Sequence, residues 1–235
     1  MRPKPPPWAH ALGQALMSDP DQAAAPSASP GEQRQELLAL LRQEPRGSAR
    51  RQQPRLTALI KALERATPAD LKQPETLAQL EGVWELRWSS SQQPYLAVGP
   101  WLENLQLLAP SLGRGMNLLR LPGPLAPLAA IAVEASIALE TSDTETSENE
   151  GGAANCQQRV RVCFERGGWL GPSLGAGRLQ LLRRVQQSFP AWLAITVLDD
   201  ELRICRGQAG TLFALIRRPD LSVQELLLPA ASTTT

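Results

Sequence analysis

Apolar residues recur at helical spacing through the first third of the chain. Leucines cluster between residues 37 and 41, among good helix formers, and predict a helix from about Glu32 to Glu44. The apolar residues between positions 56 and 63 recur at i, i+3, i+4 and i+7, which predicts a second, amphipathic helix. Pro74 suits the first turn of a short third helix over Glu75 to Leu80. The pattern therefore predicts an N-terminal helical segment.

Beyond Gly82 the pattern changes to short apolar–polar alternations separated by Gly, Pro and Ser, which is typical of an antiparallel sheet or barrel. Residues 96–128 mostly lack a sustained period. Strands are predicted at 83–88, 116–121, 129–139, 158–165, 178–185, 191–198, 202–204 and 211–216. A total of about seven to nine strands suits a small closed or nearly closed barrel.

Composition changes at both ends of the chain. The first residues are rich in Pro, Ala and Ser and contain few large apolar groups, so they cannot bury enough surface to offset chain entropy. The expected organisation is a disordered Pro/Ala-rich tail at 1–31, an N-terminal helical segment at 32–80, a β-barrel at 81–218 and a C-terminal tail at 219–235.

Charge and residue usage exclude several classes of function. A net charge of +1 gives no overall electrostatic basis for binding nucleic acid. The single histidine, His10, lies in the predicted tail, which removes histidine-based triads, dyads and zinc sites from the folded part. The longest nearly uncharged stretch, Leu121 to Val133, is too short and too rich in proline to span a membrane. We expect no catalytic residue set, no metal, no cofactor, no secretory signal and no transmembrane helix.

Tryptophan is unusually frequent, with six Trp against three Phe and one Tyr. In a regular strand Trp84, Leu86 and Trp88 share one face. Such large side chains either fill the core of a barrel or line a cavity for an apolar ligand, and both interpretations stay open. The three cysteines, Cys156, Cys163 and Cys205, match no disulfide or metal pattern and are expected to be reduced, buried packing residues.

Three further patterns have a structural and a functional interpretation. The glycine-rich stretch Gly168 to Gly177 lacks the Lys-Ser/Thr of a phosphate-binding loop and is expected to be a flexible loop. The acidic residues at 199–201 are expected to form a turn, with Arg203 or Arg206 as ionic partner, rather than to perform acid–base chemistry. Basic residues on strands suit either a solvated face or an anionic lipid surface: Arg159, Arg161, Arg183, Arg184, Arg217 and Arg218.

The run from Ala194 to Leu215 combines a strand, an Asp turn, Leu-Arg-Ile-x-Arg-Gly, a Gly turn and a final apolar strand. This order resembles the C-terminal signature of the plastid lipid-associated proteins, or fibrillins. The stretches Leu80 to Ser90 and Arg159 to Glu165 are similar to the opening and central strands of that family. The residues that match the family motif, assigned to fold maintenance, are Gly82, Asp199, Asp200, Leu202, Arg203, Arg206, Gly207 and Gly210.

The resemblance implies a mainly β (α+β) protein with a lipocalin-like antiparallel barrel behind an N-terminal helical segment. It also implies association with thylakoids or lipid globules, and an apolar partner such as a carotenoid, a quinone or an acyl lipid. A Pro/Ala-rich start without a recognisable transit peptide favours a cyanobacterial member, cytoplasmic or peripheral to the thylakoid membrane.

The expected function is therefore non-enzymatic lipid binding, with Trp84, Leu86, Trp88 and Phe213 as candidate cavity walls. One alternative is an interaction scaffold with a self-filled barrel, which binds another protein through the helix faces at Leu37–Leu41 and Leu56–Leu63. A weaker alternative is an enzyme acting on an isoprenoid or fatty acid, with Asp199 or Asp200 as general acid.

Overall fold

The computed structural model describes residues 28–91, 98–141, 158–174, 177–186 and 191–229. Helices come first: α2 (Pro30–Leu41), the 3-10 helix η1 (Ser48–Gln52), α3 (Gln53–Ala66) and α4 (Pro74–Leu80). The strands are β1 (Gly82–Ser89), β2 (Glu103–Ala109), β3 (Arg114–Arg120), β4 (Ala130–Thr141), β5 (Gln158–Leu174), β6 (Gly177–Arg184), β7 (Ala191–Leu198), β8 (Leu202–Gly207) and β9 (Leu212–Arg217). Two short 3-10 helices flank β3, at Pro110–Leu112 (η2) and Gly123–Leu125 (η3), and α5 (Val223–Leu226) follows β9.

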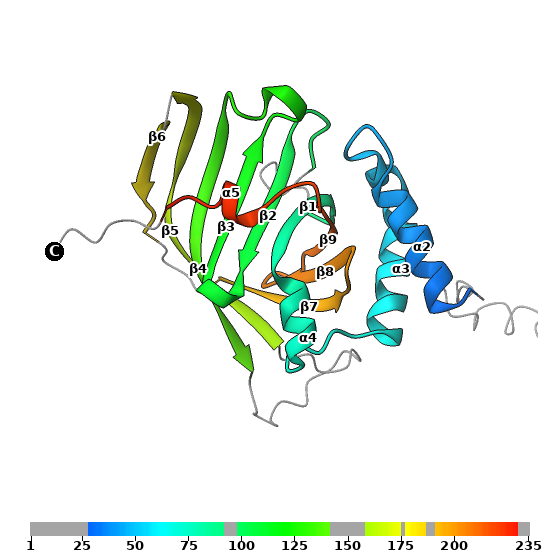
Figure 1. Cartoon of the computed structure of the whole chain (residues 1–235). Helices are drawn as coiled ribbons and strands as arrows, with labels where there is room; N and C mark the ends of the chain where they lie inside the picture. The colour runs from blue at the N-terminus through cyan, green and yellow to red at the C-terminus, as the bar shows by residue number, and fades with distance from the viewer. Residues whose placement is uncertain (1–27, 92–97, 142–157, 175–176, 187–190, 230–235) are drawn as a thin grey trace, which may run out of the picture.

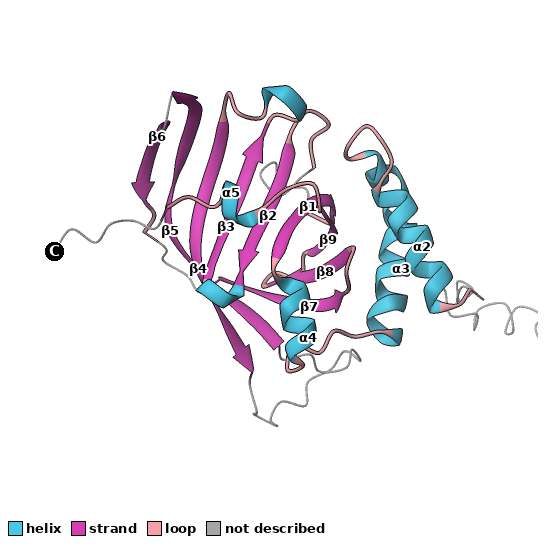
Figure 2. Cartoon of the chain, viewed as in Figure 1, coloured by secondary structure: helices cyan, strands magenta, loops and turns pink. Residues whose placement is uncertain are grey.

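Eight strands form a closed antiparallel barrel in the order β4-β3-β2-β1-β9-β8-β7-β5, which the pairing of β4 with β5 closes. Strand β5 pairs with β7 through Arg159–Val162 and with β6 through residues 166–174. One end of β5 therefore belongs to the closed barrel, and its other end pairs with β6. At that end the strands β2 to β6 form a sheet that extends beyond the closed barrel (Figures 1 and 2). The predicted fold class, a mainly β barrel behind a helical segment, is confirmed.

Two sequence expectations within the sheet were wrong. Strand β2 lies in the region that seemed to lack a period, although Leu105, Leu107 and Ala109 alternate there. The glycine-rich stretch at 168–177 was expected to be a loop, but residues 168–174 form the end of β5 and Gly177 begins β6. Its glycines permit close approach, because a Cβ at Gly168 would overlap the carbonyl oxygen of Leu181 on β6.

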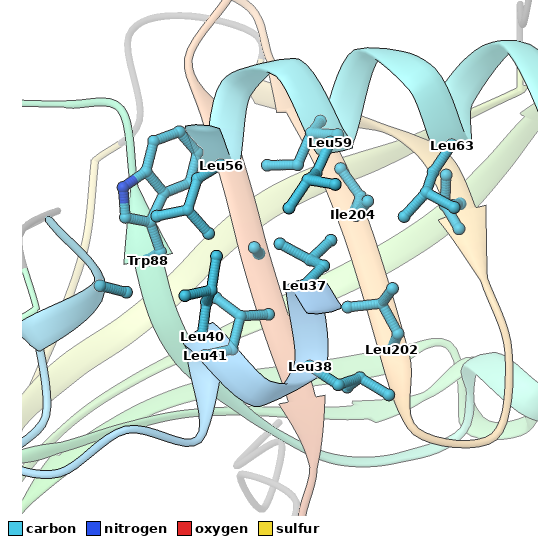
Figure 3. Packing of buried hydrophobic residues seen from close by; sticks show 14 of the residues in the cluster. Leu37, Leu38, Leu40, Leu41, Leu56, Leu59, Leu63, Trp88, Leu202 and Ile204 are labelled. Atoms are coloured by element: carbon cyan, nitrogen blue, oxygen red, sulfur yellow. The ribbon is translucent and has the colours of Figure 1, made fainter. Parts of the chain in front are cut away.

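Helices α2 and α3 pack against the outer face of β8 and β9. Their buried leucines contact Leu202 and Ile204 on β8 and Ala214 on β9 (Figure 3). A capping box between Ser29 and Glu32 begins α2, slightly earlier than the sequence predicted. The scaffold alternative needs these helix faces free, and it was wrong on this point because the barrel covers them.

The segment after β9 covers the outer face of β2 to β4 (Figure 1). Val223 and Leu228 are buried there against Leu105, Leu107 and Met116. Arg114 donates to the carbonyl oxygen of Leu228 at 2.7 Å and fixes the end of this cover. Residues 219–229, expected as part of a C-terminal tail, are therefore packed on the barrel, since their apolar residues complete a cluster that the strands alone leave open.

Candidate functional site

The inner face of the barrel carries a buried apolar cluster around Trp84. Strand pairing aligns Trp84 with Arg217 and Leu86 with Leu215, and both tryptophan and leucine lie in the same cluster as Phe213. Trp84 is fully buried, and its indole Nε1 donates to the carbonyl oxygen of Leu80 at 3.0 Å. Three of the candidate wall residues thus come together inside the barrel.

Trp88 lies on the other side of the sheet. The register between β1 and β9 shifts between Leu86 and Trp88, so Trp88 pairs with outward-facing Ala214. Its indole packs against Leu56 of α3 and Leu41 of α2 (Figure 3). The prediction that Trp84, Leu86 and Trp88 share one face was wrong, because a β-bulge inverts the alternation that the argument assumed.

Two arginines flank Trp84 inside the barrel. Arg203 lies on β8 between the outward-facing Leu202 and Ile204, and its guanidinium carbon is 5.2 Å from the Trp84 ring centroid. Arg203 is fully buried and donates from Nη2 to Oε1 of Gln106. Its Nε and Nη1 find no hydrogen-bond partner in the part of the chain that the structure describes. Arg217, 4.4 Å from the same ring, donates to the carbonyl oxygens of Gln79 and Glu81.

The surroundings of Arg203 leave its charge uncompensated. Burial lowers the pKa of Arg203 and raises the pKa of the Cys205 thiol, and the electrostatic and hydrogen-bonding interaction between these two groups opposes both shifts without outweighing them. Cys205 is therefore a neutral thiol at neutral pH and offers no counter-charge. Buried polar groups in folded proteins are normally paired, so an arginine with unpaired nitrogens at this depth is an unusual feature.

Where the sheet fans out, its inner face is apolar and open. Leu119 on β3 pairs with Ile131 on β4, Ile131 with Trp169 on β5, and Trp169 with Leu181 on β6. Ile131, Trp169 and Leu181 have 54%, 42% and 62% of their surface exposed. We call Leu119, Ile131, Trp169 and Leu181 the apolar row. A contiguous exposed row of this kind is uncommon on a surface that contacts only water.

The apolar row lies next to the barrel interior. Gln106, the hydrogen-bond partner of Arg203, pairs with Trp84 on one side and Asn117 on the other. Leu119 lies two residues beyond Asn117 on the same face of β3, a step of about 7 Å along the strand. The buried Arg203 and the open apolar row thus belong to one continuous inner surface.

The remaining residues of the family motif make contacts that stabilise turns and connections between elements. Asp199 lies in the turn after β7, where its Oδ1 accepts from the backbone N–H groups of Glu201 and Leu202 at 2.8 and 2.9 Å. Its ionic partner is Arg34 of α2, at 2.7 Å. The expectation that Arg203 or Arg206 would pair with Asp199 was wrong, because the former points into the barrel and the latter pairs with Glu64 of α3.

The other motif residues lie at both ends of β8 and at the start of β1. Asp200 is exposed, and Gly210 adopts a left-handed conformation (φ 73°) in the turn before β9. Gly82 has a φ of 146°, which side chains rarely permit, and a Cβ there would also overlap the guanidinium of Arg217, so this position favours glycine. Gly207 ends β8 with its N–H bonded to the carbonyl oxygen of Thr211 at 2.8 Å.

We expect Asp199→Asn to lower the free energy of unfolding by about 1–2 kcal/mol, because it removes a charged acceptor that joins a turn to α2. Burial opposes ionisation of Asp199, but hydrogen bonds from Arg34, Glu201 and Leu202 outweigh it and lower its pKa. This contribution is therefore complete above about pH 4 and is lost as pH falls through the lowered pKa. Urea unfolding at pH 7 and at pH 3 measures it, and equal costs at the two pH values would contradict the assignment.

The predicted basic strand residues do not form one surface. Arg159 stacks on Trp192 at 4.2 Å, and Arg161 pairs with Glu140. Arg218 is partly buried and pairs with Glu85, Glu103 and Asp220, and Arg217 points inward. Both were wrongly placed on a solvated face, whereas Arg183 and Arg184 are exposed.

Cysteine placement differs from the expectation at one position. Cys205 is buried, as predicted, but Cys163 is exposed because its side of β5 faces solvent; Cys156 lies outside the described residues. No group of three or more metal-ligating side chains occurs within the described ranges. Among the helices that the structure describes, none is both long and apolar enough to cross a membrane.

Sequence reasoning missed the open part of this inner surface. Trp169 and Leu181 were assigned to a loop and to an irregular strand, so no alternation pointed to a shared face. Gln106 lay in the region without a recognised period. The one available signal was the alternation of Leu179 and Leu181 with polar neighbours in β6.

One comparison with known protein families yields a match, to the C-terminal half of the barrel. The family model described as PAP_fibrillin matches residues 157–216, which span β5 to β9. Neither the curated proteins nor the solved structures yield a match. The matched segment contains the turn at Asp199, the inward-pointing Arg203 and the final strand. This match supports the assignment of the chain to the plastid lipid-associated protein, or fibrillin, family.

Proposed function

We propose that this protein is a non-enzymatic lipid-associated protein whose open inner face takes up the apolar part of a small molecule or lipid. The observation that carries the proposal is the apolar row across β3 to β6, with three large side chains exposed side by side. Family assignment supports a lipid as the occupant rather than another protein.

The chemistry of this face favours a long apolar chain. Covering the row would remove apolar surface from water, at about 25 cal/mol per Å². The row continues inward to the barrel interior, where Trp84, Leu86 and Phe213 are the proposed wall residues. A carotenoid, a quinone or an acyl lipid offers a chain of this kind. As part of the same proposal, the protein acts at the thylakoid membrane of a cyanobacterium, which is what the resemblance of its sequence implies.

The enzymatic alternative has two candidate acids, Asp199 and Asp200, and the surroundings of Asp199 do not favour it. Asp199 is held as a carboxylate by Arg34 and two backbone N–H groups, which lower its pKa. A general acid must carry a proton near neutral pH, so a carboxyl group stabilised in its ionised form is poorly suited to that role. Asp199 also lies at the outer contact with α2 rather than on the inner face.

A vesicle-binding comparison of two leucines tests the proposal. Leu181→Asn changes a residue of the apolar row that is 62% exposed. Leu112→Asn changes a leucine that is 65% exposed and lies in η2, before the start of β3, whereas the apolar row crosses β3 near its end. We expect Leu181→Asn to weaken flotation with vesicles of dibromostearoyl phosphatidylcholine about tenfold, because the loss of one buried leucine contact costs about 1.5 kcal/mol. Quenching of tryptophan emission by the brominated chains should fall in parallel.

The control leucine and the oligomeric state determine the interpretation. Leu112→Asn should bind these vesicles as the wild type does. Equal losses in both variants, or no binding by the wild type, would overturn the proposal. A change from dimer to monomer in Leu181→Asn, without a change in vesicle binding, would instead identify the face as an interface between copies of the chain.

A further inference from the structure

We infer that Arg203 binds the carboxylate of a fatty-acid ligand, with the acyl chain directed along the inner face toward the apolar row. The inference rests on the proposed function and names the chemical class of its ligand. It starts from a fully buried guanidinium inside the barrel with no hydrogen-bond partner for Nε or Nη1 among the described residues.

The known contacts of Arg203 do not satisfy it. Gln106 accepts one hydrogen bond from Nη2, and Trp84 presents its ring at 5.2 Å. Cys205 is neutral at neutral pH because burial raises its pKa. A buried charge without an anionic partner is costly, so the site favours a ligand that brings one.

A single carboxylate matches the charge that is free. Arg217, the second inward arginine, already donates from both terminal nitrogens to the carbonyl oxygens of Gln79 and Glu81. These carbonyls belong to the end of α4 and occupy the terminal nitrogens of Arg217, so Arg217 does not bind the same ligand headgroup as Arg203. Arg217 leaves only its Nε without a partner among the described residues, whereas Arg203 leaves both Nε and Nη1. Arg203 therefore has the larger free hydrogen-bonding capacity, and as a single cation it suits a carboxylate better than a doubly charged phosphate.

The direction of the acyl chain follows from strand register. Next to Arg203 the inner face is apolar, with Leu86, Phe213 and Leu215. Gln106 and Asn117 connect this part of the face to Leu119, where the apolar row begins. A chain that starts at Arg203 and follows the inner face therefore passes the polar side chains of Gln106 and Asn117 before it reaches the exposed apolar row.

The test compares laurate with 1-dodecanol, which has the same chain length and no charge, by isothermal titration calorimetry on the full chain. Wild type should bind laurate at least tenfold more tightly than dodecanol. Arg203→Met should bring laurate to the affinity of dodecanol, and Arg203→Lys should retain part of the preference because it keeps the charge. Arg184→Met, an exposed arginine on the outer face of β6, is the matched control and should keep the full preference.

Thermal unfolding separates a ligand-binding arginine from a structural one. Without ligand, Arg203→Met should unfold at or above the wild-type temperature, since it removes a buried unpaired charge. A clear decrease would indicate a structural role and overturn the inference, as would equal affinity of the wild type for laurate and dodecanol. The latter result leaves the proposed function intact. If the wild type binds neither compound, the inference fails, and the vesicle experiment decides the proposed function separately.

Discussion

Glu85→Gln is expected to lower the free energy of unfolding by about 3–5 kcal/mol, the largest effect that we predict for a single polar residue. Glu85 lies on the outer face of β1 with 2% of its surface exposed. Its carboxylate accepts from Arg46 at 2.6 Å, Arg87 at 3.1 Å and Arg218 at 2.8 Å. If the Glu85 carboxylate is neutralised, the three guanidinium groups repel one another without the negative charge that now compensates them. Urea unfolding at pH 7 measures the loss of stability.

A surface ion pair provides the matched control for Glu85. Glu36 pairs bidentately with Arg55, but the two side chains are 37% and 42% exposed. Glu36→Gln should therefore cost less than about 1 kcal/mol. Similar costs for the two substitutions would show that burial of the Glu85 cluster contributes nothing.

The same cluster predicts a pH dependence. Burial opposes ionisation of Glu85, but hydrogen bonds from Arg46 and Arg218 outweigh it and lower its pKa. A group with a lowered pKa in the folded state stabilises the protein above its unfolded pKa of about 4.3 and loses this contribution as the pH falls through the folded value. The difference between wild type and Glu85→Gln should therefore shrink below pH 4.

Trp84→Ala is expected to lower the free energy of unfolding by about 3–5 kcal/mol, because it opens a cavity in the barrel interior. Trp84 is fully buried, and the guanidinium groups of Arg203 and Arg217 both lie over its ring, at 5.2 and 4.4 Å from the centroid. The substitution also leaves the carbonyl oxygen of Leu80 without its indole donor. Guanidinium unfolding gives the size of the change.

Trp101 is the matched tryptophan for this measurement, because 80% of its surface is exposed. Trp101→Ala should change stability by less than about 0.5 kcal/mol. If Trp84→Ala were as mild as Trp101→Ala, Trp84 could not be a principal packing residue of the interior, and its assignment as a wall residue would fail with it.

The sequence by itself determined the class of fold and the order of its helices and strands, with the exception of β2. Leucines at helical spacing indicated α2 and α3, and alternation such as that of Val160 and Val162 indicated β5. These signals are periodic along the chain, because each helix or strand must present one apolar side to a neighbour. The resemblance at residues 194–215 added the family, which the match at 157–216 supports.

Tertiary structure alone decided which side chains share a surface. A bulge after Leu86 moved Trp88 from the barrel interior to the helices, and no local pattern marks a bulge. Arg203, in a motif read as structural, proved to be buried beside Trp84 and Gln106, which come from strands far away in the sequence. The apolar row exists only because β3, β4, β5 and β6 pair in one register. Strand register depends on contacts between distant segments, and those contacts form only when the sheet closes.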